Sequence, residues 1–262
     1  MIATLLAVAL YLAAAVLLGL SLRRADATPN RGWLPLAILA IVFHGEIHAA
    51  AWRHAGAPDM HFFAALSLSA LGMAALTSVF AMRGRMAALG VIVYPLAALF
   101  ALLYSLRGHS SPVPMDWQLQ LHAWCALLAY ATLAIAALLA ILLWIQERTL
   151  RRRDFHRWMR VLPPLTELET LLFRTIAVGF VLLTATLLTG ALFVHDLFAQ
   201  HLAHKTVLSI LSWLVFGTLL FGRWRYGWRG RSAAVMALGA MVFLFLAFFG
   251  SQFVYDFILH RA

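Results

Sequence analysis

Three ionisable residues lie close together inside the second apolar run of the sequence, IVFHGEIHAA (41–50). His44, Glu46 and His48 fall within about one and a half turns of a predicted helix. Placing an ionisable side chain inside a membrane is costly unless the group is paired or used, so such residues indicate a functional site. Imidazole groups bind zinc, copper and iron, including the iron of haem. The stretch therefore predicts metal, haem or proton chemistry within a membrane helix.

The spacing of these residues narrows the chemistry. The zinc-protease pattern H-E-x-x-H has its glutamate directly after the first histidine, whereas here one residue separates them, so a zinc protease is a poor interpretation. His44 and His48 share one face of a helix, and Glu46 points about 160° away from it. Axial ligands approach haem iron from opposite sides, so these two histidines cannot both ligate one haem. We expect a second ligand from another helix. We expect Glu46 to face the bundle, either neutral or paired with a polar neighbour, without ligating metal.

The composition indicates what kind of fold positions these residues. Of 262 residues, 64% are hydrophobic and only 11% are charged, which is typical of a polytopic membrane protein. The single cysteine, Cys125, excludes an internal disulfide, and the absence of C-x-x-C-H excludes a c-type cytochrome. A spanning helix needs about 20 apolar residues. We predict an all-α polytopic membrane protein, a bundle of about eight transmembrane helices that forms one domain over 1–262 with no soluble domain. The predicted spans are 2–22, 33–52, 62–82, 87–106, 119–145, 167–194, 204–222 and 233–258.

Basic residues predict the orientation of these spans. The net charge is +10, but the basic residues form short clusters between apolar runs, which indicates topology rather than nucleic-acid binding. Loops one, three, five and seven carry 15 arginines, and the opposite side carries 4 basic residues. Because positive loops stay in the cytoplasm, both termini are predicted to be periplasmic in a bacterial inner membrane. The four on the opposite side are Arg53, Arg107, Lys205 and Arg261.

The longest basic loop follows the fifth span. We expect the fifth helix to continue into the arginine-rich run at 148–160, and Pro163 with Pro164 to end it. Thr166 and Glu169 have the spacing of a capping box that starts the sixth helix. The arginines of this loop are interpreted as topology signals and contacts to anionic lipids rather than a partner site.

The histidines gather on the predicted outer side. There are eleven, and only His156 falls on the cytoplasmic side. At about 1.5 Å per residue, His44 lies roughly 13 Å below Arg53, near the middle of the bilayer. His122 lies near the outer start of the fifth helix, and His204 at the outer start of the seventh. Four elements thus bring imidazoles towards one outer pocket. The other outer histidines are His195 and His201, in the loop before the seventh helix, His48, and the interfacial His54, His61, His109 and His260.

Several segments resemble the cytochrome c assembly family that contains CcsA, a haem-handling membrane subunit. They are LPPLTELETLLFRTIAVGFVLLTATLLTG (162–190), HLAHKTVLSILSWLVFGTLLFGRWRYGWRGR (201–231) and ALGAMVFLFLAFFGS (237–251). The likeness covers nearly the whole chain and is strongest to a small branch of similar length. It implies haem binding and delivery at the outer face during assembly of c-type cytochromes. In LHAWCALLAYATL (121–133) it places an outer haem ligand at His122, and it relates His44 to a histidine implicated in haem transit.

One loop departs from the family pattern. Synthase members carry a W-x-W-D motif before the seventh helix, whereas this loop reads VHDLFAQHLAH and contains no tryptophan. His195, His201 and His204 stand in its place. We therefore expect a haem site without ligation of haem to an apocytochrome, and so a protein that is not an enzyme. We predict a b-type haem with His122 on one axial face. Its partner is His44 if the haem lies deep, or His204 if it lies near the surface, with His48, His195 and His201 as alternates.

Two other functions stay open. The first is a HemX-like regulatory or structural subunit without haem, which would act through its basic cytoplasmic loop. The second is a proton-coupled transporter that uses Glu46 and the histidines as a relay, although no inverted repeat is visible. The expected partners are membrane lipids, haem and other cytochrome c assembly proteins. A Soret band in the purified protein distinguishes the haem hypothesis from the others.

Overall fold

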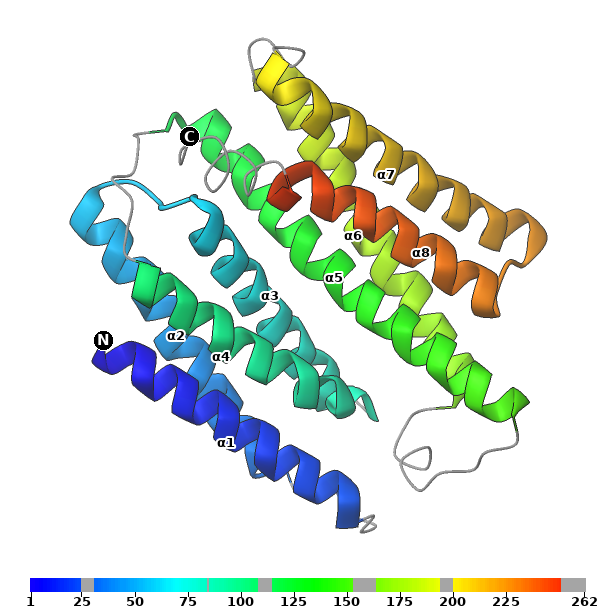
Figure 1. Cartoon of the computed structure of the whole chain (residues 1–262), viewed down its shortest axis with the longest axis horizontal. Helices are drawn as coiled ribbons and strands as arrows, with labels where there is room; N and C mark the ends of the chain where they lie inside the picture. The colour runs from blue at the N-terminus through cyan, green and yellow to red at the C-terminus, as the bar shows by residue number, and fades with distance from the viewer. Residues whose placement is uncertain (25–30, 84, 108–114, 153–163, 194–199, 251–262) are drawn as a thin grey trace. The chain divides into compact units, whose positions relative to one another are not determined.

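The protein folds as a series of long helices, seen here in a computed structural model (Figure 1). The structure describes residues 1–24, 31–83, 85–107, 115–152, 164–193 and 200–250. Within these ranges eight helices are long and apolar enough to span a membrane, and no strand occurs. The predicted all-α polytopic architecture is confirmed. The helices are α1 (Ile2–Arg24), α2 (Trp33–Ala55), α3 (Phe62–Arg83), α4 (Gly90–Arg107), α5 (Trp117–Arg151), α6 (Leu165–Phe193), α7 (Gln200–Tyr226) and α8 (Gly230–Phe245).

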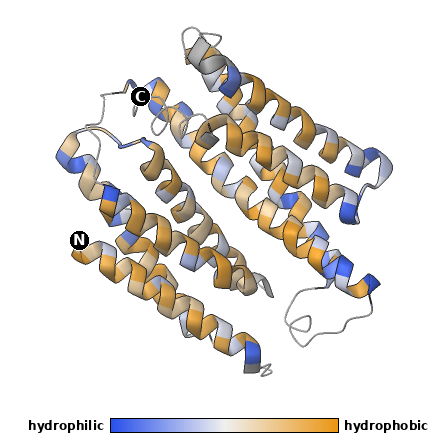
Figure 2. Ribbon diagram, viewed as in Figure 1, coloured by the Kyte–Doolittle hydropathy of each residue, from blue (hydrophilic) through white to orange (hydrophobic). Residues whose placement is uncertain are grey.

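Apolar residues cover the helices along their length. Figure 2 shows hydrophobic residues over the middle of each helix and hydrophilic ones gathered at helix ends. Large apolar side chains such as Val16, Val181 and Leu188 are more than half exposed. Exposed apolar residues in such numbers fit a lipid environment, where only helices and closed barrels satisfy every backbone polar group.

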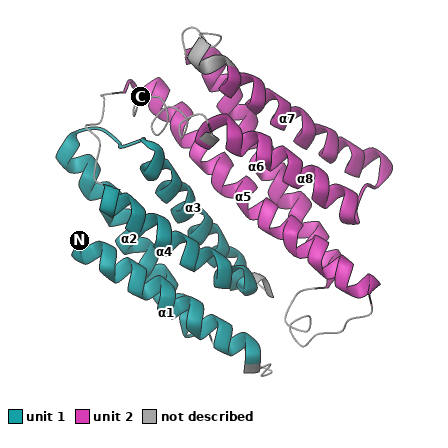
Figure 3. Ribbon diagram, in the orientation of Figure 1, with its two compact units in different colours: residues 1–114, 155–163 teal, residues 115–154, 164–262 magenta. Residues whose placement is uncertain are grey.

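The chain divides into two compact units (Figure 3). Unit 1 comprises 1–114 and 155–163, and within it α1 packs on α2 and α4, while α3 packs on α4 and α2. Its interior combines the buried rings of Tyr11 and Tyr94 with small residues such as Ala97 and Ala101. Small residues allow helices to approach closely in a membrane. A short 3-10 segment, η1 (Arg85–Leu89), precedes α4.

Unit 2 comprises 115–154 and 164–262 and is built around α5. That helix packs on both α6 and α8, and α7 packs on α8 and α6. Leu133, Leu139 and Leu143 are fully buried along α5. A π-helical turn, η3 (Leu246–Gly250), follows α8. The single domain expected over 1–262 stays a prediction.

Two expectations about helix ends have different outcomes. The fifth helix does extend past its apolar span, as predicted, but it ends at Arg151 with its C-cap at Arg152, and not at Pro163 and Pro164. The capping box predicted at Thr166 and Glu169 is wrong, because α6 already begins at Leu165. Glu169 is buried, and its Oε1 accepts a hydrogen bond from the backbone N–H of Gly230 at 2.8 Å. The carboxylate therefore ties α6 to the start of α8, a long-range contact that local spacing does not reveal.

Candidate functional site

A buried histidine on α2 connects three helices of unit 1. The His44 side chain is completely buried. Its Nδ1 lies 3.3 Å from the Tyr11 hydroxyl on α1, and its Nε2 lies 2.8 Å from the Ser67 hydroxyl on α3. Buried polar groups are costly unless hydrogen-bonded. Both ring nitrogens of His44 are thus engaged by polar side chains.

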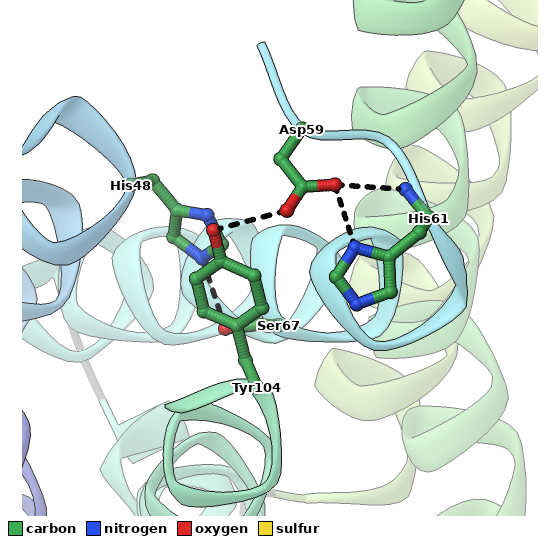
Figure 4. A network of polar contacts seen from close by, with 5 residues as sticks. All are labelled: His48, Asp59, His61, Ser67 and Tyr104. Carbon is green, nitrogen blue, oxygen red and sulfur yellow. Dashed lines mark hydrogen bonds and ion pairs between the residues drawn. The ribbon is translucent and has the colours of Figure 1, made fainter. Parts of the chain in front are cut away.

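The same serine also contacts the second histidine of α2. The Nε2 atom of His48 lies 2.9 Å from Ser67 Oγ, and its ring stacks on Tyr104 with centroids 4.5 Å apart (Figure 4). A hydroxyl carries one hydrogen and accepts through its lone pairs. If Ser67 donates to one imidazole, it accepts from the other. In that case the imidazole that accepts from Ser67 has no hydrogen at Nε2, and the one that donates to Ser67 carries one there.

A carboxylate in the segment between α2 and α3 completes the polar cluster of unit 1. Asp59 is buried, and its Oδ1 lies 2.6 Å from His61 Nδ1 and accepts the backbone N–H of His61 at 3.3 Å. The Tyr104 hydroxyl donates to its Oδ2 at 3.5 Å (Figure 4). These donors satisfy a buried carboxyl group whose burial is otherwise costly. Sequence reasoning missed Asp59, although an aspartate just before a helix start is a familiar capping signal.

The principal candidate ligand of unit 2, His122, is held from one side. Its Nδ1 lies 3.0 Å from the backbone oxygen of Thr186 and 3.2 Å from the Thr189 hydroxyl, both on α6. A carbonyl oxygen only accepts, so Nδ1 carries the hydrogen and Nε2 keeps its lone pair. Among the described residues, none forms a hydrogen bond with that Nε2. This is the arrangement in which an outer-sphere acceptor orients an imidazole for metal binding.

A glycine makes room for this imidazole. A Cβ atom on Gly190 would lie 3.1 Å from Cε1 of His122, closer than most real contacts of that kind. Threonine and glycine are common wherever membrane helices pack, so Thr186, Thr189 and Gly190 do not stand out in the sequence. In the structure they also form the cradle of His122. Only the packing of α6 on α5 reveals that second role.

The structure describes the remaining candidate histidines only in part. His204 lies near the start of α7 with an exposed side chain. His201 lies in the same helix with its side chain outside the described part, and His195 falls entirely outside it. His44 belongs to unit 1 and His122 to unit 2, so their pairing across one haem remains a prediction. In the described ranges no three His, Cys, Asp or Glu residues form a cluster fit for a bare metal ion.

Glu46 is only partly as predicted. Its carboxylate forms an ion pair with Arg53, which lies about two turns further along the same face of α2. The expected polar partner is therefore confirmed. The expectation that it faces the bundle is wrong, because its side chain is 52% exposed. The long arginine side chain can reach back along the helix and neutralise a carboxylate at the surface. Glu46 therefore does not join the hydrogen-bonded cluster of His44 and His48.

Comparison with known proteins identifies the relatives of this fold. A family model described as cytochrome C assembly protein matches residues 32–259. The chain belongs to the cytochrome c assembly protein family. The match covers α2 to α8 and so includes His44 and His122, whereas Tyr11 on α1 lies before it.

Individual members of this family show how far the likeness extends. The chain is 34% identical to the inner membrane protein YpjD of Escherichia coli K12 over 239 residues, which cover 86% of this chain and 88% of YpjD. It is 27% identical over 188 residues to the cytochrome c biogenesis protein CcsA of Parasynechococcus marenigrum, covering 62% of this chain and 60% of CcsA. No solved structure matches the chain. The sequence-based resemblance to the family is confirmed.

Proposed function

We propose that this chain binds haem b through His122 and assists haem handling for cytochrome c assembly at the periplasmic face of the bacterial inner membrane. The observation that carries the proposal is the hydrogen bond of His122 Nδ1 to the Thr186 carbonyl, which leaves Nε2 as a lone-pair donor. Membership of the cytochrome c assembly family supports haem as the cargo. Other assembly proteins are the proposed partners.

The residues around His122 suit an axial ligand. The Thr186 carbonyl and the Thr189 hydroxyl fix the ring and its tautomer, and such partners also raise the basicity of the ligating nitrogen. Gly190 leaves room for the ring, because a Cβ there would lie 3.1 Å from its Cε1 atom. Haem held there would present its iron to Nε2. The protein itself supplies binding and orientation, which is the work of an assembly factor rather than of an enzyme.

For the second axial position we propose His204 in preference to His44. His204 is exposed and, within the described residues, forms no hydrogen bond. It also shares unit 2 with His122. His44 would have to leave both Tyr11 and Ser67 before it could bind iron. His48 would likewise have to leave Ser67.

The direct test is the absorption spectrum of the protein purified from haem-replete cells. We expect a Soret band and a pyridine haemochrome of b type, with about one haem per chain, because among the described residues of unit 2 only His122 is held in this way by a backbone carbonyl. Apoprotein loaded with added haem serves as the reference for full occupancy. A purified protein that carries no haem and binds none on titration would refute the proposal. The HemX-like regulatory function, acting through the basic loop, would then take its place.

The proposed orientation has its own test. Reporter fusions after Arg31, Arg85, Arg160 and Arg231 should all report a cytoplasmic location, because the arginine-rich loops stay on that side. Fusions after Arg53 and Arg107 provide the opposite controls and should report the periplasm. A periplasmic signal from the fusion after Arg160 would reverse the orientation and remove the haem site from the periplasmic face.

A further inference from the structure

A basic pocket lies at the far end of α5, away from the haem ligand. Its volume is about 420 Å³, room for well over ten water molecules at roughly 30 Å³ each. Two separate helices line it, because α5 supplies most of the residues and the first turn of α8 supplies one. The lining residues are Trp144, Glu147, Arg148, Arg151, Arg152 and Arg231.

The start of α8 approaches α5 closely because of a glycine. Gly230 has a φ of +66°, a conformation that favours glycine. A Cβ on it would lie 3.2 Å from Glu147 Oε2. This close approach brings Arg231 to the pocket that the end of α5 forms. The pocket is therefore built by tertiary packing and not by the arginine run alone.

The charges around the pocket are poorly balanced. Arg151 donates to Glu147 Oε1 at 2.6 Å, which neutralises one arginine. Arg148, Arg152 and Arg231 form no ion pair within the described residues. Three guanidinium groups that have no ion pair with a described residue repel one another around one pocket, and guanidinium matches phosphate geometry well. A topology signal needs the positive charges but no such pocket.

An aromatic ring adds an apolar wall to this site. The Arg148 guanidinium lies over the Trp144 ring at 5.3 Å from its centroid, a cation–π arrangement. Tryptophan is enriched where the lipid tails meet the headgroups. A ligand here would thus meet positive charge beside an amphipathic ring. That combination suits an amphiphile with an anionic head.

We propose that this pocket binds the phosphate group of an anionic membrane phospholipid. Basic pockets between membrane helices bind such headgroups. Arg148, Arg152 and Arg231 contact the phosphate, and Trp144 contacts the glycerol region. The site does not depend on the haem site and holds whether or not His122 binds haem.

The test measures lipid binding by native mass spectrometry of the full chain in neutral detergent. Phosphatidylglycerol should bind more tightly than phosphatidylcholine. Each arginine near a charged membrane surface is worth about fivefold in affinity. The triple variant R148Q/R152Q/R231Q should therefore lose affinity for phosphatidylglycerol on the order of a hundredfold. R225Q is the matched control, since Arg225 is another arginine of unit 2 that does not line the pocket, and it should bind as the wild type does.

Two further variants keep the result interpretable. The triple lysine variant R148K/R152K/R231K retains the charge and should recover part of the binding if the first variant is folded. Glu147→Gln removes the one acidic side chain among the described residues that line the pocket and should tighten binding. Inorganic phosphate supplies the competing ligand. Equal binding of phosphatidylglycerol to the triple glutamine variant, equal binding of phosphatidylcholine, or displacement of lipid by inorganic phosphate at similar concentration would each overturn the lipid assignment.

Discussion

A His122→Ala protein is expected to lose its Soret band while it remains inserted in the membrane. The substitution removes the Nε2 lone pair that we propose as an axial ligand, and it leaves the apolar spans unchanged. Loss of an outer-sphere partner alone costs 10–100-fold in metal affinity, so loss of the ligand itself should reduce haem retention about tenfold or more. The measurement is the ratio of Soret to protein absorbance after purification.

Two controls make this result specific. His54→Ala removes an exposed histidine near the end of α2 and should keep the wild-type Soret ratio. Imidazole added to the His122→Ala protein should restore part of the band, because a free ring can occupy the vacated position against Gly190. A His122→Ala protein with full haem content would contradict the proposed ligand.

A His44→Ala protein is expected to lose stability and keep its haem. The change leaves the Tyr11 and Ser67 hydroxyls without their buried partner and opens a cavity between three helices. Removing a buried, hydrogen-bonded side chain of this size costs about 2–4 kcal/mol. The measurement is size-exclusion chromatography after heating. The temperature at which half of the monodisperse peak is lost should be clearly lower for the variant than for the wild type.

The haem content of the same variant decides between the two proposed pairs. If His204 supplies the second ligand, the Soret band of His44→Ala keeps its position and intensity at low temperature. A variant with normal thermal stability and no Soret band would show instead that His44 ligates iron. His54→Ala again serves as the matched control, because it changes a histidine of the same helix without a buried partner network.

Much of the architecture could be predicted from hydropathy because each span must be apolar over about 20 residues. The predicted span 2–22 corresponds to α1, and 62–82 to α3, to within two residues at either end. The last span was less accurate. It was predicted over 233–258, whereas α8 begins at Gly230 and ends at Phe245 before η3, with 251–262 outside the described residues. The ends of a helix depend on turn chemistry and packing, which average hydropathy does not register.

Only the titratable residues of the candidate site could be predicted from the sequence. His44 and His122 stand out in the sequence because an imidazole in an apolar span is rare. Ser67, Thr186 and Gly190 do not, since hydroxyl and small residues are common wherever membrane helices touch. Glu46 faces outward, contrary to the prediction, because Arg53 reaches back along α2 to pair with its carboxylate. The sequence does not show which residue contacts each of these side chains across a helix interface.

The Ser67 hydroxyl connects two histidines of α2 to a tyrosine of α1. A hydroxyl has a single hydrogen, so when His48 donates to Ser67 at Nε2, that hydrogen can point towards His44. His44 then carries its own hydrogen at Nδ1, and the Tyr11 oxygen accepts it. In this arrangement the four side chains form one chain of hydrogen bonds, and its direction is set by the protonation of His48.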